Sequence, residues 1–137
     1  NDGYNIKWYC IGDGHEKDNY KQIIKNLNIE NDYILLGSKL NPYPFMKYCD
    51  IYVQPSRYEG YGLVIAEARI LQKPIVATDF TVVHNQIIDG KNGLISQMNS
   101  DSLYKCVKRM IEDENLQNHS PGTEEEIFKI YKLIEGK

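Results

Sequence analysis

The sequence predicts an α/β fold: a Rossmann-like open parallel sheet of about five strands with helices on both faces. Short runs of β-forming residues alternate with helical patterns along the chain. Most of these runs lead into glycine or other turn residues, as parallel strands do where they connect to a helix. The 137 residues are enough for a single domain with a core of its own.

The first third of the chain predicts a strand over residues 6–11, a helix over 16–28 and a strand over 33–36. Gly12 and Gly14 form a Gly-x-Gly turn between the first strand and the helix. The third glycine of a dinucleotide-binding fingerprint is absent, because position 17 is Lys17. A nucleotide-binding turn and an ordinary tight turn are therefore both consistent with this segment.

The middle and end of the chain continue the alternation. Proline suits the first turn of a helix and ends one that is already formed, so Pro42 and Pro74 mark a helix start and a helix end. A final helix over 123–135 is indicated by a capping box, and Ser100 or Asp101 is expected to cap the helix before it. The remaining helices are expected over 42–49, from near 61 to 72, and from the cap at Ser100 or Asp101 to about 113. The remaining strands are expected over 50–54, 75–77 and 94–96.

Composition excludes several classes. A net charge of −3 without a basic stripe argues against a nucleic-acid surface. No apolar run approaches the length of a membrane-spanning helix, and no signal-peptide pattern is seen. Cys10, Cys49 and Cys106 cannot all pair and have no metal-ligand spacing, so reduced thiols in a cytosolic protein are expected.

The segment from Glu59 to Glu67 carries the most chemistry. Two carboxylates flank Gly60 and Gly62, and an apolar run then begins a helix. Amides in the first turn of a helix lack intrahelical acceptors and favour an anion such as phosphate. Glu67 has only apolar neighbours at helical spacing, so it needs hydrogen-bond donors, and a ribose diol would supply two.

Structural interpretations of the same residues stay open. Glu59 could cap a loop, and Glu67 could pair with Arg69 or Lys73. Arg57 could neutralise a phosphate, but an ion pair with Glu59 or plain exposure is the simpler expectation.

The spacing of the two glutamates resembles the E-x7-E motif of the family 4 (group 1) retaining glycosyltransferases, which have the GT-B fold. Residues 55–63 carry the motif, and residues 73–78 and 89–95 are similar to later blocks of the same family. The resemblance extends from about residue 9 to residue 98. It implies that the chain is part of the C-terminal, nucleotide-sugar-binding domain and that the N-terminal acceptor domain is absent.

The resemblance also implies roles for particular residues. It makes Glu67 the ligand of the donor's ribose and Glu59 the catalytic-site ligand of the transferred sugar. The residues that it places around the diphosphate are Gly60, Tyr61, Gly62 and Leu63. The residues that it places beside the donor cleft and the base are Gly12, Gly14, Ser38, Lys39 and Leu40.

For the parent enzyme, the resemblance implies transfer of a sugar from a nucleotide donor to a hydroxyl acceptor in polysaccharide or glycoconjugate synthesis. No metal or other cofactor is expected. The missing acceptor domain is the expected partner, and the expected location is cytoplasmic, with membrane attachment only through absent parts. The family's Arg/Lys pair for the diphosphate has no match before Trp8, so the chain alone is expected to be inactive.

One segment departs from the family pattern. Thr81, Val82 and Asn85 stand where most members have two glycines and a glutamate, which we interpret as a subfamily difference. His84, in the same segment, is expected to be structural or solvated. Two alternative functions remain open from the sequence: a non-catalytic Rossmann-like binding module, and a dinucleotide-binding oxidoreductase domain resting on the Gly-x-Gly turn.

Overall fold

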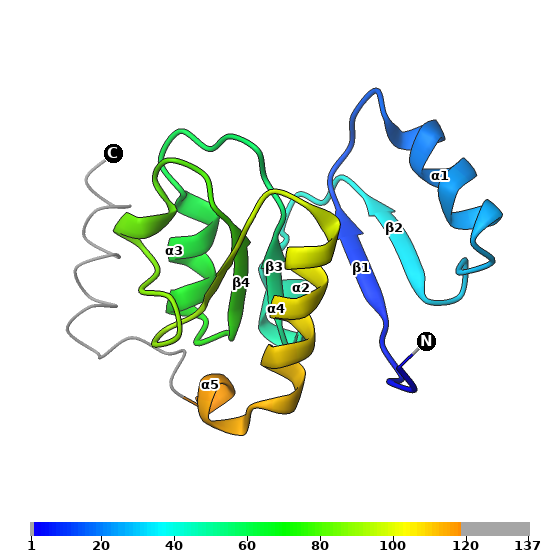
Figure 1. Ribbon diagram of the computed structural model, residues 1–137. Helices are drawn as coiled ribbons and strands as arrows, with labels where there is room; N and C mark the ends of the chain where they lie inside the picture. The colour runs from blue at the N-terminus through cyan, green and yellow to red at the C-terminus, as the bar shows by residue number, and fades with distance from the viewer. Residues whose placement is uncertain (1, 119–137) are drawn as a thin grey trace. The chain divides into compact units, whose positions relative to one another are not determined.

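A computed structural model describes residues 2–118 of the chain (Figure 1). The helix predicted over 123–135 lies outside these described residues. The elements, in order, are β1 (Trp8–Ile11), α1 (Lys17–Asn26), β2 (Tyr33–Gly37), α2 (Tyr43–Tyr48), β3 (Tyr52–Gln54), α3 (Leu63–Ile70), β4 (Ile75–Thr78), the 3-10 helix η1 (Val83–Asn85), β5 (Leu94–Ser96), α4 (Ser100–Glu112) and α5 (Glu114–Asn118).

All five predicted strands are present, and every strand pair is parallel. They are hydrogen-bonded as a two-stranded sheet, β1-β2, and a three-stranded sheet, β3-β4-β5. The chain accordingly divides into two compact units, Asn1–Pro42 and Tyr43–Lys137. A residue pattern identifies strands but does not specify which strands pair, so this division was not visible in the sequence.

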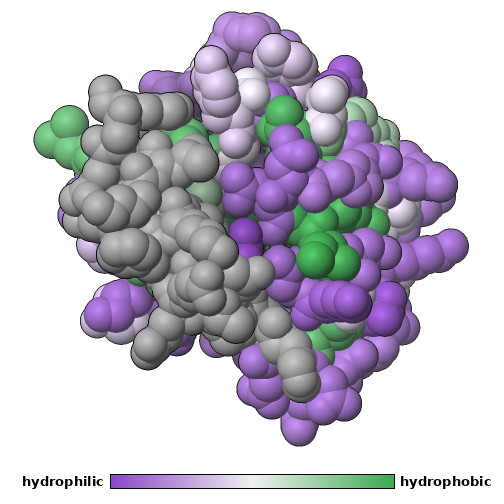
Figure 2. Space-filling model, turned by 90° about the vertical axis from the view of Figure 1, so that its left-hand side faces the viewer, coloured by the Kyte–Doolittle hydropathy of each residue, from purple (hydrophilic) through white to green (hydrophobic). Residues whose placement is uncertain are grey.

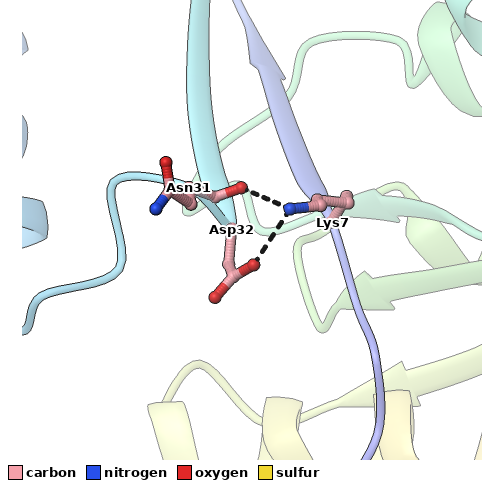
Figure 3. Close-up of polar contacts among 3 residues, drawn as sticks. All are labelled: Lys7, Asn31 and Asp32. Atoms are coloured by element: carbon pink, nitrogen blue, oxygen red, sulfur yellow. Dashed lines mark hydrogen bonds and ion pairs between the residues drawn. The ribbon is translucent and has the colours of Figure 1, made fainter.

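The first unit is held by contacts along its two strands. The rings of Trp8 and Tyr33 stack with centroids 5.9 Å apart and planes inclined by 8°. At the amino end of the pair, Lys7 Nζ donates to the carbonyl oxygen of Asn31 at 2.7 Å and to Asp32 Oδ1 at 3.2 Å (Figure 3). The register shifts between Cys10 and Ile11, just before the glycine turn.

The second unit has helices on both faces of its sheet, and β4 shows why. Successive side chains of a strand point to opposite faces. Ile75 and Ala77 contribute to one core cluster, and Val76 contributes to the other. The first cluster draws in Met46 of α2 and three residues of α3, and the second draws in residues of α4 and α5. This arrangement is the doubly wound architecture that the sequence predicted.

Helix α4 is present as the sequence predicted, but a different residue caps its start. Its cap is Asn99 rather than Ser100 or Asp101, because the Asn99 side chain accepts a hydrogen bond from Ser102 N at 2.8 Å. Asn is as good an N-cap as Ser or Asp. The helix buries an apolar face: Met110 is fully buried, with partly buried apolar neighbours on the same face of the helix.

Figure 2 shows a face on which hydrophilic residues predominate and apolar residues gather only in small patches. Within residues 2–118, no helix combines the length and apolar character needed to cross a membrane. Cys10, Cys49 and Cys106 are free thiols, and burial raises the pKa of Cys49 and Cys106.

Candidate functional site

The junction between β3 and α3 turns at Gly62, which is buried and has a φ of 65°. Side chains disfavour this left-handed backbone, so glycine suits the position. The helix begins at Leu63 rather than near Tyr61, as the sequence had suggested, because Gly62 breaks the helical backbone there. Among the described residues, the amides of Leu63 and Val64 donate no hydrogen bond, as expected in a first helical turn.

Glu59 lies half-buried in the loop before this turn. Gln54 Nε2 lies 2.8 Å and Ser56 Oγ lies 2.7 Å from the same oxygen, Glu59 Oε1. Glu59 Oε2 accepts no hydrogen bond from any described residue. Arg57 is exposed and forms no ion pair with Glu59 in the part of the chain that the structure describes. Glu59 therefore has one occupied oxygen and one available oxygen.

The backbone around Glu59 is fixed from β4. Thr78 Oγ1 donates to the carbonyl oxygen of Ser56 and lies 3.3 Å from that of Gln54. The hydroxyl of Tyr52 donates to Gln54 Oε1. This oxygen belongs to the same side-chain amide whose Nε2 donates to Glu59. The strand end, the loop and the neighbouring strand therefore together determine where the Glu59 carboxylate lies.

Glu67 lies on α3, half-buried, as the sequence predicted. Its donor is Tyr43, whose hydroxyl is 2.9 Å from Glu67 Oε1 and comes from the first residue of α2. This hydrogen bond to Glu67 is the main cause that raises the pKa of Tyr43. Lys73, one suggested partner of Glu67, instead donates to the carbonyl oxygen of Cys49 at 2.9 Å.

Tyr52 shows that the two carboxylates lie in one neighbourhood. Burial raises the pKa of its hydroxyl, and the negative charges of Glu59 and Glu67 raise this pKa further. Both charges thus act on the same hydroxyl, although the two glutamates belong to different elements. The second unit therefore presents two carboxylate oxygens and the open amides of Leu63 and Val64, a set that suits a polyol carrying an anionic group.

The candidates of the first unit gather at the carboxyl end of its own sheet. The amide of Gly12 donates to the carbonyl oxygen of Gly37 at 3.0 Å, which ties the glycine turn to the end of β2. Gly12 has a φ of 138°, which side chains rarely adopt. Ser38, Lys39 and Leu40 follow β2 directly, and Leu40 is fully exposed. These residues stay predicted contacts of the donor.

Several residues of the site were not identified in the sequence: Tyr43, Tyr52, Gln54, Ser56 and Thr78. Gln54 offered a weak signal, since it is a polar residue ending a strand at the edge where parallel sheets bind ligands. Tyr43 offered none, because it lies twenty-four residues from Glu67 in the chain.

The segment that departs from the family pattern packs against the helix start. Val82 Cγ2 lies 3.6 Å from the point where a Cβ on Gly62 would stand. His84 lies in η1, and its Nε2 atom is 2.7 Å from Asp79 Oδ1. Both side chains are more than half exposed. This pairing and this exposure agree with the expectation that His84 is structural or solvated. Among the described residues, no three His, Cys, Asp or Glu side chains form a group suited to a metal ion.

Comparison with known proteins decides the family. The family model described as "Glycosyl transferases group 1" matches residues 1–121. The chain belongs to this family. The resemblance drawn from the E-x7-E motif is thereby confirmed, and the chain is a C-terminal domain of the GT-B type. Neither the oxidoreductase nor the non-catalytic alternative is favoured.

The curated relatives of this glycosyltransferase domain include two bacterial sugar transferases. Over 114 residues it is 32% identical to the Campylobacter jejuni N-acetylgalactosamine-N,N'-diacetylbacillosaminyl-diphospho-undecaprenol 4-alpha-N-acetylgalactosaminyltransferase, covering 82% of this chain and 31% of that protein. Over 113 residues it is 30% identical to the poly(ribitol-phosphate) alpha-N-acetylglucosaminyltransferase of Staphylococcus aureus, covering 81% of this chain and 23% of that protein. The chain therefore spans a third or less of these relatives.

Solved structures agree. TarM superposes with a TM-score of 0.80 at 26% identity, over 98% of this chain and 28% of that one. Anabaena HepE in complex with UDP and glucose superposes with a TM-score of 0.78 at 26% identity, over 95% of this chain and 39% of that one. The glycosyltransferase domain therefore shares its α/β fold with both of these structures over nearly its whole length.

Proposed function

We propose that this domain binds a UDP-sugar for a retaining glycosyltransferase that transfers the sugar to a hydroxyl acceptor. The observation that carries the proposal is the placement of Glu59 just before α3 and of Glu67 on α3, each with one oxygen held by a side-chain donor and the other open to a ligand hydroxyl. In this assignment Glu67 accepts from the ribose and Glu59 from the transferred sugar. UDP is the favoured nucleotide because HepE and a TarM variant were solved with it.

The diphosphate is assigned to the start of α3. The amides of Leu63 and Val64 stand at the positive end of the helix dipole, where an anion is stabilised. Gly60 leaves open space around its backbone, so phosphate oxygens can approach closely. Fixed donors at this place stabilise the negative charge that grows on the departing diphosphate during transfer. In this proposal the reaction needs no metal ion.

Transfer also needs parts beyond this chain. The two amides described at the helix start offset the charge of two phosphates only partly, and Lys7, the cation just before β1, already binds Asp32 (Figure 3). We therefore expect weak donor binding and no transfer by the 137 residues alone. The N-terminal domain of the same enzyme supplies the acceptor site in this proposal. The enzyme would build a polysaccharide or glycoconjugate on the cytoplasmic side, and any membrane attachment would use other parts.

The test is an NMR titration of the chain with UDP, GDP, ADP, their common sugar conjugates and NAD. We expect UDP and UDP-sugars to shift amides around residues 60–67, and Glu67→Ala to remove the response. Glu112→Ala, a carboxylate lost from helix α4, is the matched control and should keep it. A response to NAD alone, or shifts unaffected by Glu67→Ala, would contradict the proposal.

A further inference from the structure

The side chains that hold Glu59 form a connected chain with a defined direction. Resting on the proposed role of Glu59 as a sugar ligand, we propose that Tyr52, Gln54 and Ser56 are positioning residues that fix one oxygen of Glu59 and leave the other for a hydroxyl of the donor sugar. We call this chain of hydrogen bonds from Tyr52 through Gln54 to Glu59 the relay, and Tyr52 is its inner end. Its effect on Glu59 passes through the side-chain amide of Gln54.

The direction follows from the chemistry of the amide. A glutamine amide has an acceptor at one end and a donor at the other. Tyr52 donates to Gln54 Oε1, so Nε2 points to Glu59 Oε1 at 2.8 Å. The reversed amide would place its oxygen against the carboxylate, with two acceptors facing each other. The Tyr52 hydroxyl therefore selects the orientation of Gln54 that is attractive to Glu59.

Tyr52 is suited to remain a donor. Its ring is partly buried against the core cluster of the second unit. Burial and the charges of Glu59 and Glu67 raise the pKa of its hydroxyl, so it stays protonated throughout the physiological pH range. A hydroxyl that stays protonated keeps donating to Gln54 Oε1 and so holds the amide in one orientation.

The second donor to Glu59 is fixed separately. Ser56 Oγ lies 2.7 Å from Glu59 Oε1 and 2.6 Å from Gln54 Nε2, and Thr78 binds the carbonyl oxygen of Ser56. Two donors thus converge on Oε1. Because an ionised carboxylate only accepts hydrogen bonds, the remaining Oε2 selects a ligand group that donates one, such as a sugar hydroxyl.

The first test needs no ligand. With ¹³C-labelled glutamate, the carboxyl signal of Glu59, assigned through Glu59→Gln, is compared between the natural chain and Tyr52→Phe. We expect the signal to move, because Gln54 loses the bond that orients it. Tyr33→Phe is the matched control, since Tyr33 is also a partly buried strand tyrosine, and should leave the signal in place. A Glu59 signal that stays unmoved in Tyr52→Phe overturns the relay.

The second test separates the sugar from the nucleotide. The relay predicts that Tyr52→Phe weakens binding of UDP-glucose by about fivefold, the factor that corresponds to one ordinary hydrogen bond, while binding of UDP changes by less than about twofold. In a Gln54→Ala background the same substitution should add no further loss, because its route to Glu59 is gone. Equal losses for UDP and UDP-glucose, or additive losses in the double variant, would overturn it.

The two tests also separate this inference from the proposed function. If neither UDP nor UDP-glucose shifts any amide of the natural chain, the donor-binding proposal fails in this chain. The Glu59 carboxyl signal still decides whether Tyr52 orients the carboxylate. If the nucleotides bind but the carboxyl signal does not respond to Tyr52→Phe, the proposed function stands and the relay fails.

Discussion

The two units of the molecule differ in how deeply their strands are buried. All four residues of β4 are buried, whereas every residue of β1 and β2 is at least partly exposed to solvent. Tyr9 of β1 is 56% exposed. Both core clusters of the described residues lie in the second unit, and Ile24 is the one buried residue described in the first. Strands of parallel sheets are normally covered on both faces.

This difference bears on function. Glu59 and Glu67 are attached to the well-packed unit, where a rigid core can hold two carboxylates in fixed positions. The glycine turn and residues 38–40 belong to the unit with little core of its own. The comparison predicts that stability is concentrated in the second unit and that equivalent substitutions in the two units have unequal effects.

The largest expected effect is the loss of a buried β4 side chain. Ile75→Ala removes a fully buried isoleucine and should lower the free energy of unfolding by about 2–5 kcal/mol. Ile34→Ala makes the same change in β2, where the side chain is partly exposed, and should cost less by at least about 1 kcal/mol. Urea unfolding followed by far-UV circular dichroism measures both. Equal losses would mean that the two units are equally packed.

A smaller effect is expected from adding a methyl group. A Cβ on Gly93 would lie 3.0 Å from the carbonyl oxygen of Ile75 and 3.1 Å from the side chain of Ile87. Gly93→Ala should therefore cost about 1–3 kcal/mol through overpacking. Gly14→Ala, in the first unit, meets nothing within 4 Å and should leave the unfolding midpoint nearly unchanged. A neutral Gly93→Ala would show that β5 can shift away from β4.

Helix capping offers a third contrast. Asn99→Ala removes the side chain that caps α4 and should cost about 1 kcal/mol. Glu16, at the cap position of α1, makes no capping hydrogen bond, so Glu16→Ala should cost only about a few tenths of a kcal/mol. Thermal unfolding of both variants checks the difference. A larger loss for Glu16→Ala would reverse the assignment of a working cap to α4.

The smallest effect belongs to the ion pair of the first unit. Lys7 and Asp32 are 47% and 58% exposed, so solvent screens their attraction. Lys7→Met should change the free energy of unfolding by less than about 1 kcal/mol, and the change should shrink in high salt. Urea unfolding at low and high sodium chloride measures it. A loss that is large and independent of salt would show that Lys7 contributes mainly through the carbonyl of Asn31.

Residue patterns were sufficient to predict much of the fold and of the candidate site. The alternation of strand and helix, the apolar face of α4 and the motif from Glu59 to Glu67 are local in sequence, so periodicity and spacing reveal them. The family followed from the same motif. The start of α3 was misplaced because Gly62 could have continued the loop or begun the helix, and only its left-handed φ decides.

The tertiary structure decided what depends on residues distant in the chain. Tyr43 reaches Glu67 across twenty-four positions, and Thr78 reaches Ser56 across twenty-two, so no local pattern links them. The pairing of strands into two sheets is likewise a choice among distant partners. The two carboxylates and their spacing can be read from the sequence alone. The fold alone decided which donors hold them and which oxygens remain open, because hydrogen-bond partners are set by proximity in space.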